Sequence, residues 1–72
     1  MENKGQRFKR VASRRTNAVL KKLQVLGHCA NKHAYDYSEE EVNRIFGEIE
    51  KEVKLTKTKF QLSSNKNKKF SL

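Results

Sequence analysis

The sequence predicts an all-α protein: a two-helix antiparallel hairpin with a disordered basic C-terminal tail, dimerising into a bundle. Proline is absent and glycine occurs only three times among 72 residues, so the residues that form most turns are scarce. Two separate stretches repeat apolar residues at helical spacing, which favours two amphipathic helices. Only 35% of residues are hydrophobic, and so short a hairpin buries little surface by itself. We therefore expect a second copy of the chain, as a homodimer, to complete the core.

The first predicted helix covers about residues 6–26. Five apolar side chains fall within one sector about 60° wide when residues are placed at steps of ~100°. They are Phe8, Ala12, Val19, Leu23 and Leu26. Gly27 follows them and suits the left-handed position that ends many helices. The start of this helix is less sharply marked and can lie anywhere from Asn3 to Phe8.

The second predicted helix covers about residues 39–60. Ser38 and Glu41 have the spacing of a capping box, in which each side chain binds the backbone N–H of the other residue. Glutamates in the first turn also favour the positive end of the helix dipole. Seven side chains then share a sector about 100° wide. They are Val42, Ile45, Phe46, Ile49, Val53, Thr56 and Phe60.

The two helices and their connection form one predicted domain, residues 1–62. Residues 63–72 are polar and rich in lysine, a composition typical of disordered segments. The single cysteine, Cys29, allows no internal disulfide, which favours a reducing compartment. No apolar signal-peptide core and no stretch of ~18 apolar residues are evident. We therefore expect a cytoplasmic protein without a membrane partner.

Charge is divided unevenly along the chain, whose formal net charge is +9. Residues 1–34 carry nine Lys or Arg and one acid, Glu2. Residues 35–53 have a net charge of −5, and residues 54–72 carry six lysines and no acid. A positive charge of this size on a short chain attracts polyanions. Nucleic acid, either DNA or RNA, is therefore the favoured partner.

The candidate nucleic-acid site is a basic face of the first helix. Arg7, Arg10, Arg14 and Lys21 fall within a sector about 60° wide, nearly opposite the apolar face. Arg15 and Lys22 flank this sector. Guanidinium groups bind phosphates bidentately, and each neutralised phosphate releases a counterion. The alternative interpretation is a solvated helix face, although acids are not interleaved with these cations.

Other candidate chemistry lies between the helices. His28, Cys29, His33 and Asp36 are the clustered potential metal ligands. They match a structural zinc site poorly, because such sites need four ligands, commonly paired Cys or His. A nucleophilic cysteine would also need a pocket and an oriented base, for which a two-helix chain has little room. We therefore predict no enzymatic activity, no metal site and no cofactor.

The acidic block and the apolar residues outside the main faces leave other roles open. The acids of residues 35–53 can pair with the basic first helix, fixing a hairpin or dimer register, or can dock a basic partner; the former is favoured. Leu20 and Val25 lie outside the first apolar sector. They suggest an alternative function, a protein-interaction module that inhibits or adapts a host complex through its helix faces.

The chain also resembles a group of short helical proteins encoded by Gram-positive bacteria and their phages or other mobile elements, a group without an assigned function. The resemblance covers about two thirds of the chain. It rests on Arg15-Thr16-Asn17, Leu23 to Gly27, Asn31-Lys32, Tyr35 to Glu40 and Val42 to Phe46. His28 departs from the pattern, where asparagine is usual. The resemblance implies a bacterial accessory protein and assigns no functional residue.

Overall fold

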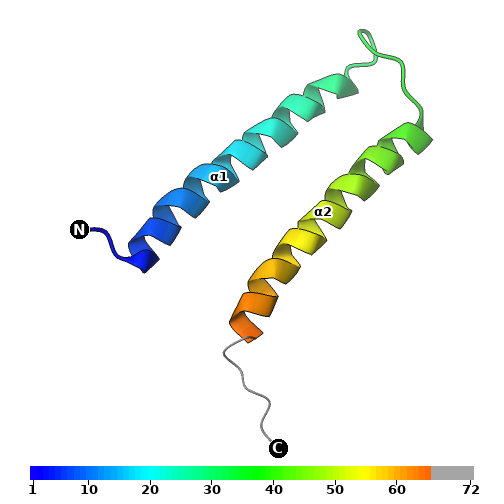
Figure 1. Ribbon diagram of the computed structural model, residues 1–72. Coiled ribbons are helices and arrows are strands. Elements are labelled where there is room, and N and C mark those ends of the chain that lie inside the picture. The colour runs from blue at the N-terminus through cyan, green and yellow to red at the C-terminus, as the bar shows by residue number, and fades with distance from the viewer. Residues whose placement is uncertain (66–72) are drawn as a thin grey trace, which may run out of the picture. The chain divides into compact units, whose positions relative to one another are not determined.

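The computed structural model describes residues 1–65, which contain two α-helices, one short 3-10 helix and no strand (Figure 1). The elements are α1 (Lys4–Gly27), η1 (His28–Ala30) and α2 (Glu39–Asn65). The all-α prediction is therefore confirmed for this part of the chain. The chain separates into two units, Met1–Asp36 and a second that begins at Tyr37. The antiparallel hairpin and the dimer stay predictions.

Helix α1 begins two residues before the expected position because Asn3 caps it. The Asn3 Oδ1 atom accepts a hydrogen bond from the Gln6 backbone N–H at 2.8 Å. The Asn3 backbone N–H in turn donates to Gln6 Oε1 at 3.1 Å. These reciprocal bonds form a capping box that satisfies N–H groups left unpaired at a helix start. The beginning of α1 thus lies within the predicted range.

The end of α1 differs from the prediction. Gly27 has φ −59° and ψ −25°, in the right-handed helical region, and no residue with a described conformation has a positive φ. The expected left-handed cap at Gly27 is therefore wrong. The chain instead continues into η1, where tighter 3-10 hydrogen bonding extends the helical path by one short turn.

Asn31 organises the short connection after η1. Its backbone carbonyl accepts hydrogen bonds from the N–H groups of Ala34 and Tyr35, at 3.1 and 3.0 Å. Its side-chain Oδ1 accepts from the His33 N–H at 3.0 Å. An asparagine side chain that binds a backbone N–H two residues ahead is a common way to stabilise a turn. Residues 28–35 are therefore ordered by local bonds.

Helix α2 begins as the sequence predicts. The Ser38 backbone N–H donates to Glu41 Oε1 at 2.9 Å, and the Glu41 N–H donates to Ser38 Oγ at 3.1 Å. Three glutamates, Glu39 to Glu41, occupy the first turn, where the helix dipole favours negative charge. The predicted capping box is confirmed.

Helix α2 ends at Asn65, five residues beyond the predicted end at Phe60. The predicted disorder is therefore wrong for residues 63–65. Neither proline nor glycine follows Phe60, so nothing in the covalent chain breaks the helix there. The rest of the predicted tail, residues 66–72, lies outside the described residues.

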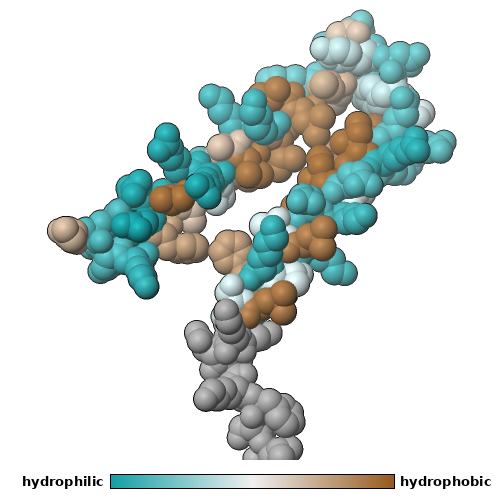
Figure 2. All heavy atoms as spheres, viewed as in Figure 1, coloured by the Kyte–Doolittle hydropathy of each residue, from teal (hydrophilic) through white to brown (hydrophobic). Residues whose placement is uncertain are grey.

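Both helices leave their apolar faces exposed. Among residues 1–63 no side chain is buried. Figure 2 shows apolar side chains distributed along each helix. Large apolar side chains that remain accessible include Phe8, Val19, Leu23, Ile45, Phe46, Val53 and Phe60. Each helix therefore has an apolar stripe of the kind that is normally covered in a stable protein.

Candidate nucleic-acid interface

Helix α1 is positively charged along its length. It contains eight Lys or Arg residues and no acid, and all eight side chains are exposed. The six candidate site residues, Arg7, Arg10, Arg14, Arg15, Lys21 and Lys22, all belong to this helix. Because these cations lie on one rigid element, their spacing is set by helix geometry.

One side of α1 carries four of these cations, here called the cationic ridge: Arg7, Arg10, Arg14 and Lys21. The helix is continuous from Lys4 to Gly27, so the predicted periodicity of ~3.6 residues applies to all four. From Arg7 to Lys21 the helix rises about 21 Å, at ~1.5 Å per residue. This length corresponds to the axial rise of about six base pairs of duplex DNA, at ~3.4 Å per base pair. The ridge is therefore long enough to contact several phosphates of a duplex.

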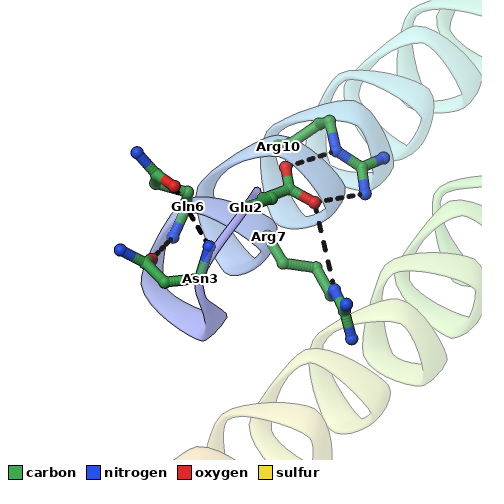
Figure 3. A network of polar contacts seen from close by, with 5 residues as sticks. All are labelled: Glu2, Asn3, Gln6, Arg7 and Arg10. Carbon is green, nitrogen blue, oxygen red and sulfur yellow. Dashed lines mark hydrogen bonds and ion pairs between the residues drawn. The ribbon is translucent and has the colours of Figure 1, made fainter.

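Glu2 binds the N-terminal end of the ridge (Figure 3). The Arg10 Nε–H donates to Glu2 Oε2 at 2.8 Å, and Arg10 Nη2 donates to Glu2 Oε1 at 3.0 Å. Arg7 Nε lies 3.9 Å from the same Oε1 atom. The hydrogen bonds that Arg10 donates to the Glu2 carboxylate raise the pKa of Arg10 above its ordinary value. Two cations of the ridge therefore share one carboxylate, an arrangement called here the Glu2 clasp.

Sequence reasoning missed the Glu2 clasp. Glu2 lies outside α1 and eight residues before Arg10, whereas helical pairing rules consider residues three or four apart. Two signals were available. Glu2 is the only acid among residues 1–34. Asn3 and Gln6 have capping-box spacing, which fixes the start of α1 and thus the path of the residues before it.

The remaining candidate residues are not neutralised within the described part of the chain. Within residues 1–63, no ion pair or side-chain hydrogen bond is formed by Arg14, Arg15, Lys21 or Lys22. Arg15 and Lys22 flank the ridge, as the helical spacing predicts. This group, here called the open cationic group, combines four exposed positive charges on about two and a half turns of α1.

The candidate metal ligands and the candidate nucleophile in the connection between the helices do not gather into one site within residues 1–65. Among residues 1–65, no three His, Cys, Asp or Glu side chains gather in a way that could hold a metal ion. Cys29 is an exposed free thiol at the middle of η1. His33 contributes its backbone N–H to the turn at Asn31. The connection between the helices is therefore characterised by the hydrogen bonds of the turn at Asn31.

No protein-family model matches this sequence, and neither curated proteins nor solved structures give a significant match. Neither helix in residues 1–65 combines the length and the apolar character required to cross a membrane.

Proposed function

We propose that this protein is a small basic accessory protein that binds the backbone of nucleic acid, DNA or RNA, through the Arg/Lys face of α1. The residues proposed to contact phosphate are Arg7, Arg10, Arg14, Arg15, Lys21 and Lys22. The observation that carries the proposal is one continuous helix with eight cations and no acid. A solvated helix face normally mixes both signs, whereas a phosphate-binding face needs one sign only.

The proposed binding is electrostatic and independent of base sequence. Each arginine can donate two parallel hydrogen bonds to a phosphate, and lysine adds a point charge. Binding releases counterions condensed on the nucleic acid, which supplies the favourable free energy. No aromatic side chain lies within the cationic ridge, so stacking on bases contributes nothing to this face.

Fluorescence polarisation at several salt concentrations tests the proposal on a short mixed-sequence DNA duplex. If about four to six phosphates are neutralised, log affinity falls with log salt with a slope of about −4 to −5. Replacing Arg14, Arg15, Lys21 and Lys22 with alanine should remove most of this dependence.

The matched control replaces Lys51, Lys54, Lys57 and Lys59 of α2 with alanine, an equal loss of charge. It should retain the wild-type slope, because those lysines lie on a different helix. Absence of binding at low salt, a flat salt dependence, or equal losses in both variants would contradict the proposal.

We further propose that the chain folds as an antiparallel hairpin and pairs with a second copy into a four-helix bundle. The support is the apolar stripe on each helix, most of whose side chains are exposed and would be covered in a bundle. In such a bundle the stripes face inward and the cationic ridge faces outward. A dimer would therefore present two ridges.

We also propose that the protein has no catalytic role. It would act in the cytoplasm of a Gram-positive bacterium or belong to the mobile elements of such a bacterium. Two exposed amphipathic helices provide surfaces for binding, whereas catalysis needs an enclosed pocket with an oriented base. The bacterial setting is supported by the resemblance noted over about two thirds of the chain.

The second candidate function is a protein-interaction module that inhibits or adapts a host complex. Leu20 and Val25 favour it, because these side chains are 51% and 50% exposed and lie outside the apolar stripe of α1. The two side chains point about 140° apart around the helix, so a partner groove could cover either of them. Capture of one stoichiometric protein that survives nuclease treatment would support this function over nucleic-acid binding.

A further inference from the structure

We propose that Glu2 competes with nucleic-acid phosphate for Arg7 and Arg10, so that α1 binds first through the open cationic group. This inference rests on the proposed function and assigns a regulatory residue to the same face. Glu2 then sets how many phosphates the helix contacts at a given salt concentration. Four of the six candidate residues form the open cationic group. The other two contact Glu2, Arg10 through hydrogen bonds and Arg7 through a longer ion pair at 3.9 Å.

The contact geometry makes competition direct. Arg10 directs Nε and Nη2 at the two oxygens of Glu2, at 2.8 and 3.0 Å. These two nitrogens form one edge of the guanidinium group, and the same edge grips a phosphate bidentately. A carboxylate and a phosphate cannot occupy that edge together. Phosphate binding there therefore requires Glu2 to leave.

The capping box keeps Glu2 near its arginines. Asn3 has φ −86° and ψ 176°, an extended conformation fixed by its two hydrogen bonds with Gln6. The Glu2 side chain is 33% exposed, compared with 57% for Arg10 and 68% for Arg7. The Glu2 side chain is thus more enclosed than either arginine side chain. Figure 3 shows it lying between the two arginines.

The strength of the clasp suits a competitor that phosphate can displace. Ion pairs between exposed side chains are weak and are screened by salt, changing an equilibrium by at most about fivefold. Because the clasp and a single phosphate contact are of similar strength, phosphate displaces Glu2 in only part of the bound complexes. Removing Glu2 should therefore raise affinity by about two- to fivefold at low salt, and by less at high salt.

Glu2→Gln tests this inference in the full chain, because glutamine has nearly the same shape and no charge. Glu48→Gln is the matched control, since it removes one negative charge from an exposed position on α2. On a mixed-sequence DNA duplex, the wild type and Glu48→Gln should give salt slopes near −4. The slope of Glu2→Gln should be steeper by about 1 to 2, because up to two more phosphates are engaged.

The side-chain N–H signals of arginine provide a readout that needs no nucleic acid. In NMR spectra of the free protein, the Arg10 Nε–H should exchange with water more slowly than that of Arg14, and Glu2→Gln should abolish the difference. Equal exchange in the wild type would overturn the inference. Duplex binding with equal slopes for Glu2→Gln and Glu48→Gln would overturn it while leaving the proposed function standing. Absence of duplex binding by all three proteins would overturn both.

Discussion

Single side chains decide where each helix begins. Asn3 and Gln6 at α1, and Ser38 and Glu41 at α2, exchange hydrogen bonds between side chain and backbone at 2.8 to 3.1 Å. Every one of these residues is exposed, so the bonds act locally and need no core. The caps therefore define the helix starts even where tertiary packing contributes nothing.

Ser38→Ala should destabilise α2 by about 1 kcal/mol, because an N–H of the first turn loses its acceptor. Circular dichroism during urea titration would measure the change in the free energy of unfolding. Ser38→Asp is the control, since aspartate also caps helices well, and it should behave like the wild type. Equal stability of Ser38→Ala and Ser38→Asp would show that the cap contributes nothing.

Within the elements, the sequence signals for helix ends were weaker than those for helix starts. Gly27 continues α1 with right-handed dihedral angles, and α2 runs past Phe60 to Asn65. A glycine permits a left-handed cap and does not require one. An end without proline or glycine depends on the gradual loss of hydrogen-bond partners, which composition reflects poorly.

Gly27→Ala should stabilise the protein by about 0.5 to 1 kcal/mol, because alanine loses less backbone entropy on folding. The dihedral angles of Gly27 suit alanine, and an added Cβ would meet no atom within 4 Å. Gly47→Ala is the control, since Gly47 lies inside α2 and also has open space. Urea unfolding should show a higher free energy of unfolding for both variants. A lower value for Gly27→Ala alone would indicate that Gly27 adopts the left-handed cap conformation.

On the scale of the whole molecule, no side chain is buried among residues 1–63. The helices in this part of the chain therefore form without a hydrophobic core. Isolated helices are marginal in water, and most helical stability in proteins comes from covering an apolar face. The stripe of α2, which includes Ile45, Phe46 and Val53, is exposed here. The proposed bundle therefore predicts that folding depends on association.

Sedimentation equilibrium should show a dimer, and the midpoint of thermal unfolding should rise with protein concentration, because association stabilises only the folded state. Ile49→Glu places a charge within the stripe of α2 and should reduce both the dimer and the helix content. Asn43→Glu adds the same charge outside the stripe and should have little effect. A monomer whose helix content is unchanged by Ile49→Glu would contradict the bundle.

The sequence by itself determined the two helices, their capping box at Ser38 and the alignment of cations on α1, because hydrogen bonding and periodicity within a helix act between residues at most four apart. It also supplied all six candidate site residues. Only the three-dimensional structure revealed that Glu2 forms ion pairs with Arg10 and Arg7, and that the helical path continues through Gly27 into η1. These features depend on where side chains and backbone meet in space, and residue spacing alone does not fix that meeting.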